Sequence, residues 1–200
     1  MKKTIFVAFI TAIMLSNCSN DKNENLVPLT ENETNNLKFV REEEKLARDV
    51  YMYAYTKYQT AIFNDISQSE QKHMDAVLKM LNKYGVTDSA SAQIGVFNNQ
   101  ELQSLYNNLT TQVNISLIDA LKVGATIEDL DINDIDDFIV NTSKQDLLKV
   151  YGNLTCGSKN HIRSFTGQLS ANSSSYTPQF ISLEEYNSIL SETSGSCGNN

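Results

Sequence analysis

The chain of 200 residues contains no tryptophan, two prolines, eight glycines and two histidines. Because proline interrupts helices, its scarcity is typical of a mostly helical protein. A hydrophobic fraction of 40% is enough for one domain with a sizeable core. The sequence also lacks a glycine-rich phosphate loop, a nucleophile elbow and a thiol-based redox motif. Three common kinds of enzyme site are therefore not expected.

Positive charge is scarce as well. The formal net charge is −8, and removing the first 17 residues would lose Lys2 and Lys3 but no acidic residue, which gives −10. Such a surface repels nucleic acid and anionic lipid headgroups. We therefore expect no nucleic-acid partner.

The N-terminus has the pattern of a targeting segment. Two lysines precede an apolar stretch, residues 4–15, that is too short to span a bilayer. It ends in Leu15-Ser16-Asn17-Cys18, which resembles a bacterial lipobox, although asparagine stands where glycine or alanine is usual. We expect residues 1–17 to be a signal peptide, Cys18 to be lipidated, and residues 18–29 to be a tether. This predicts an extracytoplasmic, lipid-anchored protein of the cell envelope; the alternative is ordinary signal-peptide cleavage near a spare cysteine.

Two further cysteines, Cys156 and Cys197, remain in the mature chain. Outside the cytoplasm an even pair favours a disulfide, here between a helix and the tail at residues 191–200, which we expect to be flexible. The alternative is two free thiols.

Capping residues and periodicity predict an all-α fold. Caps are expected at Thr30 with Glu33, at Ser116, at Thr142 or Ser143, and at Ser182. The predicted helices cover about residues 31–58, 61–85, 99–109, 117–140 and 144–171, with a last short helix from 183. The joint before the second helix is tight, residues 86–115 form a long connection, and the joint before the fifth is tight again. This connectivity is typical of a ferritin-like four-helix bundle with a long crossover, here over residues 30–190.

Each long predicted helix carries an apolar stripe at alternating spacings of three and four, and each stripe has a polar interruption near its middle. The interrupting residues are Glu44, then Glu70 and His73, then Glu128 and Asp131, and finally Ser158 and His161. Burying one unpaired carboxylate costs several kcal/mol, so four carboxylates with two imidazoles imply a cation among them. Two divalent metal ions would neutralise the four carboxylates.

The spacing of these residues suits a dinuclear carboxylate site. Glu70-x-x-His73 places a carboxylate and an imidazole on one helical face, one turn apart. Glu44, Glu128 and His161 lie at matching depths on the other helices. Asp131 has two interpretations, a fourth carboxylate ligand or a helix cap at a break in residues 130–134.

Glu44-Lys45-Leu46-Ala47-Arg48-Asp49-Val50-Tyr51 looks like the Glu-x-x-Ala-Arg-x-x-Tyr pattern of rubrerythrin-type ferritin-like proteins. Together with Glu70-x-x-His73, residues 120–131 and residues 157–163, it resembles a bacterial and archaeal family classed as a ferritin-like domain of unknown function. The resemblance covers about residues 30–190 and implies a four-helix, di-iron-type fold. Superfamily members usually carry a second Glu-x-x-His where this chain has Ser158, and Asp131 would replace the missing carboxylate.

The family resembled has no established substrate; by analogy with the wider superfamily, we expect a di-iron oxidoreductase that oxidises Fe(II) with O2 or peroxide. Its cofactor would be two iron ions, with manganese as the alternative. Glu70 and Glu128 would bridge the ions, Glu44 and Asp131 would be terminal ligands, and each histidine would cap one ion. The competing hypothesis is a non-enzymatic envelope module with a structural metal or none. A homodimer is compatible with the sequence.

Residues near the stripes carry weaker expectations. Glu42 and Glu43 fall off the stripe and are expected to be solvated. Met52 is expected to pack in the core. Tyr51 is expected in the core, within hydrogen-bonding reach of the site.

Overall fold

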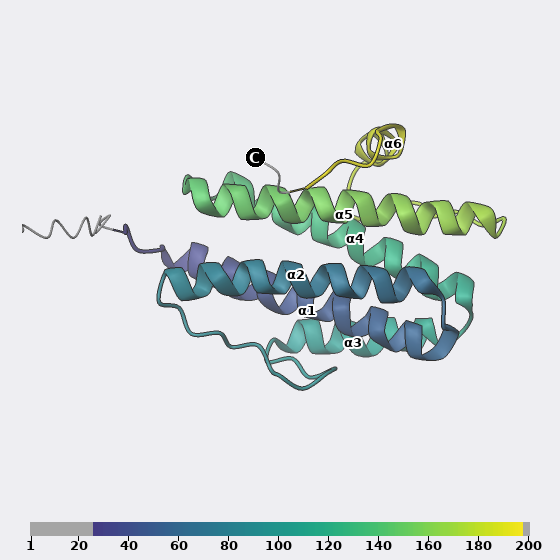
Figure 1. Cartoon of the computed structure of the whole chain (residues 1–200), viewed down its shortest axis with the longest axis horizontal. Coiled ribbons are helices and arrows are strands. Elements are labelled where there is room, and N and C mark those ends of the chain that lie inside the picture. Colours follow the sequence, from purple (N-terminus) through teal and green to yellow (C-terminus); the bar gives the residue numbers. More distant parts are fainter. Residues whose placement is uncertain (1–25, 198–200) are drawn as a thin grey trace, which may run out of the picture.

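The computed structural model describes residues 26–197, which fold into six helices without a strand (Figure 1). The helices are α1 (Glu31–Tyr58), α2 (Ala61–Lys83), α3 (Gln100–Val113), α4 (Leu117–Val140), α5 (Gln145–Ala171) and α6 (Leu183–Ser191). The predicted all-α class is confirmed. None of these helices is long and apolar enough to cross a membrane. The predicted signal peptide and Cys18 lie outside the described residues.

Four long helices form the bundle. The hairpins α1–α2 and α4–α5 are the most closely packed pairs, α1 also contacts α4, and α2 contacts α5. Helix α3 packs against α1 and α4 on the outside of the bundle, and α6 lies on the outer side of α5 (Figure 1). The segment between α2 and α3, residues 84–99, returns along the bundle next to α1 (Figure 1).

Local capping explains most helix boundaries. Thr30 and Glu33 form a reciprocal capping box at the start of α1, and Ser116 and Ser182 accept backbone hydrogen bonds at the starts of α4 and α6. The predicted cap of α5 is wrong, because its N-cap is Lys144 and no side chain caps it. The Thr142 hydroxyl instead donates to Glu33 Oε1 at 2.6 Å, which joins the start of α5 to the start of α1.

Two apolar clusters fill the bundle on either side of a polar layer. One contains Tyr51, Phe63 and Phe165 and extends beneath α3 and α6. The other contains Leu37, Val77, Leu147 and their neighbours. The residues that interrupt the stripes lie between the two clusters. Their side chains therefore face one another in the interior of the bundle.

One side of α1 is buried where the periodicity predicted solvent. Glu42 and Glu43 are each 3% exposed, so the prediction that they are solvated is wrong. The returning segment covers Glu42, which accepts hydrogen bonds from the backbone amides of Asn98 (3.0 Å) and Asn99 (2.8 Å). Met52, predicted in the core, is 38% exposed.

Candidate metal centre

The six predicted ligands come from the four long helices. Glu44 lies on α1, Glu70 and His73 on α2, Glu128 and Asp131 on α4, and His161 on α5. The four carboxylates and His161 are buried, and the side chain of His73 is 14% exposed. Five of the six form two overlapping groups of ligand atoms, and Asp131 belongs to neither.

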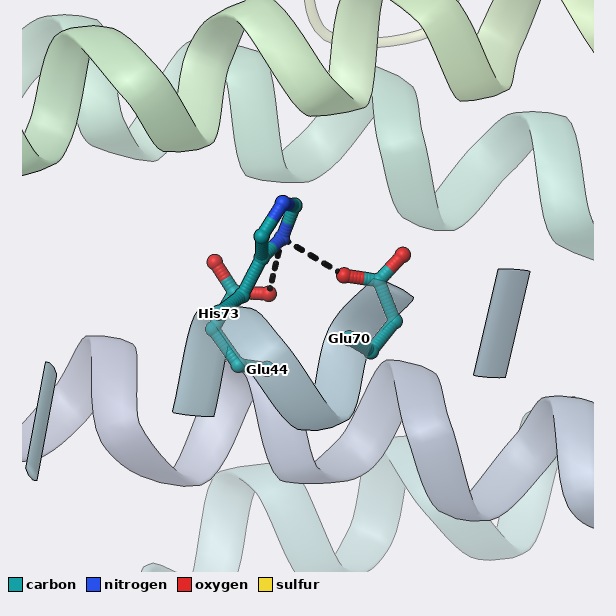
Figure 2. Close-up of side chains that lie close together, drawn as sticks. All are labelled: Glu44, Glu70 and His73. Carbon is teal, nitrogen blue, oxygen red and sulfur yellow. Dashed lines mark hydrogen bonds and ion pairs between the residues drawn. The ribbon is translucent and has the colours of Figure 1, made fainter. Parts of the chain in front are cut away.

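The first group contains Glu44, Glu70 and His73. Nδ1 of His73 lies 2.7 Å from Oε2 of Glu70 and 3.1 Å from Oε2 of Glu44. Figure 2 shows both carboxylates converging on this edge of the imidazole, with Glu44 approaching from α1 and the other two residues from α2. One ligand atom from each of the three residues lies within 4.8 Å of the other two.

The second group contains Glu70, Glu128 and His161. Nδ1 of His161 lies 2.8 Å from Oε1 of Glu70 and 3.3 Å from Oε2 of Glu128. These ligand atoms also lie within 4.8 Å of one another. Glu70 therefore belongs to both groups and presents a different oxygen to each, while the rings of His73 and His161 stack with centroids 5.6 Å apart.

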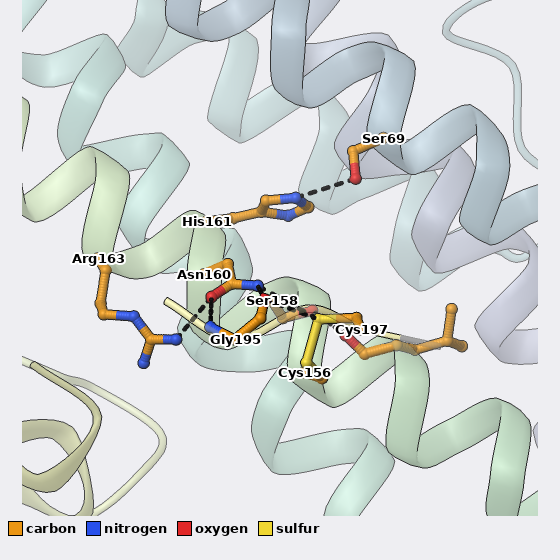
Figure 3. Close-up of a disulfide and its surroundings, with 9 residues drawn as sticks. Ser69, Cys156, Ser158, Asn160, His161, Arg163, Gly195 and Cys197 are labelled. Carbon is orange, nitrogen blue, oxygen red and sulfur yellow. Dashed lines mark hydrogen bonds between the residues drawn. A yellow bond between two sulfur atoms is a disulfide. The ribbon is translucent and has the colours of Figure 1, made fainter. Parts of the chain in front are cut away.

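Hydrogen bonds from outside the two groups hold the ligands in position. The Tyr51 hydroxyl donates to Oε1 of Glu128 at 2.5 Å, as expected for a core tyrosine within reach of the site. Nε2 of His161 lies 3.0 Å from the Ser69 hydroxyl (Figure 3). With Nε2 held by Ser69, the Nδ1 edge of His161 stays directed at the carboxylates.

Asp131 lies beside Ser158, the residue at which the resemblance led us to expect a second glutamate. The Ser158 hydroxyl donates to Oδ2 of Asp131, whereas Oδ1 of Asp131 is buried without a hydrogen-bond partner. Helix α4 continues unbroken past this position, so the interpretation of Asp131 as a helix cap is wrong. Its role as a ligand stays a prediction.

Burial and mutual repulsion set the electrostatics of the cluster. Burial raises the pKa of Asp131 to about 7, with a further contribution from the charge of Glu128. Burial also raises the pKa of Glu44 well above its ordinary value. For Glu70 burial acts in the same direction, but the two imidazoles outweigh it and lower the pKa. Burial would lower the pKa of His161, but Glu70 and Glu128 raise it to about 10.

The donor set fits a pair of divalent ions. Two imidazoles meet four carboxylates, which leaves an excess of negative charge in a buried site. Oε1 of Glu44 is buried without a hydrogen-bond partner, as is Oδ1 of Asp131. Buried carboxylate oxygens normally find a donor or a metal ion, so these atoms are free to bind a cation.

Residues 33–193 match the family described as Uncharacterized protein domain (DUF2202). The chain belongs to this family. It is 49% identical over 167 residues to the protein named Uncharacterized protein MJ0754 of Methanocaldococcus jannaschii. The matched region covers 83% of this chain and 90% of that protein. The crystal structure of hypothetical protein MJ0754 matches with a TM-score of 0.83 at 48% identity, over 84% of this chain and 97% of that one.

In this DUF2202 chain a disulfide joins Cys156 on α5 to Cys197 in the C-terminal segment, with an S–S distance of 2.07 Å. Asn160 adds a second connection, because its side-chain amide donates to the Gly195 carbonyl at 3.0 Å (Figure 3). The segment after α6 is thereby attached to α5 within five residues of His161.

Two residues that contact the predicted ligands were absent from the predicted site residues. Ser69 precedes Glu70, and nothing in its sequence context distinguishes it from an exposed helical serine. Gly157 had a detectable signal, since glycine inside a helix is unfavourable without a local reason. A β-carbon at Gly157 would lie 2.5 Å from Cε1 and Nε2 of His73, so the glycine makes room for the imidazole.

Proposed function

We propose that α1, α2, α4 and α5 form a ferritin-like bundle that holds a dinuclear metal centre and oxidises Fe(II) with O2 or peroxide. The observation that carries the proposal is the position of Glu70, whose two oxygens face two separate groups of ligands. A single metal ion would leave one of the two groups of ligand atoms without an ion. The fit of a carboxylate-rich oxygen and nitrogen donor set to iron or manganese supports the choice of metal.

The proposed ligands follow from the two groups. Glu44 and His73 would hold one ion, Glu128 and His161 the other, and Glu70 would bridge them. This modifies the bridging pair expected from the sequence, because Glu128 lies in one group alone. Asp131 would supply the fourth carboxylate after a rotamer change, either of Ser158 or of Asp131.

Iron bound here would supply one-electron redox chemistry. Two Fe(II) ions would give two electrons. With two protons these would reduce O2 to peroxide, or peroxide to two waters. The protein's part is positional: Tyr51 holds Glu128, Ser69 holds His161, and the apolar clusters on either side exclude bulk water. Because the same fold supports many chemistries, the oxidase assignment rests on the donor set and the resemblance together.

Stoichiometric Fe(II) titration under anaerobic conditions, followed by a pulse of O2 or peroxide, tests the proposal. We expect two Fe(II) per chain and a rapid rise in near-ultraviolet absorbance that Glu70→Gln abolishes. The exposed Glu31→Gln on α1 is the matched control and should behave like wild type. Failure to bind Fe(II), or oxidation no faster than in buffer, would reject the proposal.

We also propose an extracytoplasmic location with a lipid anchor at Cys18. The disulfide supports it, because such bonds persist mainly in oxidising compartments. The non-enzymatic envelope module remains the competing proposal. It differs in predicting full folding after chelation and unchanged stability in Glu70→Ala.

A further inference from the structure

A surface pocket of about 650 Å³ lies between α1, α4 and the returning segment. Its volume falls within the range of about 300–1,000 Å³ that is typical of small-molecule sites. None of the six predicted metal ligands lines it. The pocket is therefore a separate feature of the molecule, and its chemistry follows from its own lining residues.

Two aromatic rings in contact with each other line the pocket. Phe39 of α1 and Phe138 of α4 have ring centroids 6.0 Å apart and ring planes at 79°. Both side chains are half-buried, so each keeps part of its surface exposed. The face of an aromatic ring carries partial negative charge and attracts organic cations. These rings therefore suit a ligand that combines an apolar group with a positive charge.

The charged residues of the pocket are mainly acidic. Asp134 and Asp137 lie one turn apart on α4, and Glu42 of α1 is buried, with each carboxylate oxygen accepting one backbone hydrogen bond. Lys38 is the one basic residue of the lining. Among residues 26–197, no ion pair within 4.0 Å includes Asp134, Asp137 or Lys38. Three carboxylates and one ammonium group thus leave the lining with an excess of negative charge.

We infer that this pocket binds a small organic cation, an amine with an apolar portion. Its ammonium group would lie beside Asp134 and Asp137, and its apolar portion would lie against Phe39 and Phe138. A hydrated metal ion would not need the aromatic rings, and an anion would be repelled by the carboxylates, so the combination favours an amine. The inference is independent of the proposed metal chemistry, because the pocket contains no residue of the two ligand groups.

Titration of the chain with phenethylamine, followed by the NMR shifts of backbone amides, tests the pocket. Phenethyl alcohol is the matched neutral probe. We expect saturable shifts at the residues that line the pocket, and an affinity about two- to fivefold lower for the alcohol. Asp137→Asn, which alters an exposed carboxylate, should weaken amine binding by a similar factor. Lys38→Met should strengthen it, because a like charge is removed.

Asp65→Asn on α2 is the matched control, because its carboxylate is exposed and lies outside the pocket. It should bind the amine as wild type does, and all three variants should keep the wild-type melting temperature. Equal affinities for amine and alcohol would overturn the inference, as would shifts outside the pocket or unchanged amine affinity in both Asp137→Asn and Lys38→Met. The dinuclear centre would stand in each of these cases.

Discussion

At the scale of single residues, the centre is a set of buried ionisable groups that the protein alone does not neutralise. His161 pairs with Glu70 and Glu128, and His73 with Glu44 and Glu70. Asp131 receives only the Ser158 hydroxyl. Because burying charge without a partner is costly, protons should take the place of metal ions in the metal-free protein.

The metal-free protein should therefore lose stability as pH rises. The pKa of Asp131 is raised to about 7, so its stabilising protonation is present in acid and lost as pH approaches 7. The pKa of His161 is raised to about 10, so its contribution is complete below about 6.5 and lost as pH rises toward 10. The pKa of Glu70 is lowered, so its ionised carboxylate stabilises the folded state. This contribution to stability is lost only as pH falls below the ordinary pKa of 4.5.

Thermal unfolding of chelated protein at about pH 5.5 and about pH 8 measures this effect. We expect the lower melting temperature at pH 8, and the reverse order in metal-loaded protein, because protons compete with metal for the same ligands. A metal-free melting temperature that rises between these pH values would contradict the assigned charge states.

At the scale of elements, boundaries were predictable where the capping interaction is local. Thr30 and Glu33 are three residues apart, and Ser116 and Ser182 cap by the same short-range contact. The start of α5 was not predictable, because the Thr142 hydroxyl donates to Glu33, which is 109 residues away in the chain. Local patterns cannot reveal such a contact.

The outer side of α1 shows the limit of helical periodicity. A stripe identifies the face that packs in the bundle, but it does not show that the returning segment and α3 cover the opposite face. Lys45 and Asp49, both fully buried, form an ion pair of 2.6 Å there, and Lys45 also donates to the Gln93 carbonyl at 2.9 Å. The burial of Glu42 was missed for the same reason.

The approach of α5 to α2 at Gly157 gives an element-scale prediction. Gly157→Ala would force the His73 ring to move, since the new β-carbon would lie 2.5 Å from it. We expect metal affinity to fall about tenfold or more, as for other changes that misplace a metal ligand. Isothermal titration with Mn(II) measures it.

Gly152→Ala is the matched control on the same helix, because a β-carbon there meets nothing within 4 Å. It should stabilise the helix by about 0.5–1 kcal/mol without changing metal affinity. Equal affinities in the two variants would show that Gly157 has no part in placing His73.

At the scale of the whole molecule, two apolar clusters stabilise a bundle whose middle layer is polar. The depth of that layer was predictable, because all four stripes are interrupted at matching positions along their helices. The sharing of Glu70 between two groups was not, because it depends on the relative offset of the helices and on side-chain rotamers. The sequence therefore predicts the members of the candidate site better than their division into two groups.

Anomalous diffraction from crystals of the chain loaded with Fe(II) or Mn(II) tests the dinuclear centre most directly. We predict two strong peaks within bonding distance of the Glu70 carboxylate, one beside Glu44 and His73 and the other beside Glu128 and His161. A single peak, peaks away from Glu70, or none at saturating metal would contradict a centre bridged by this residue.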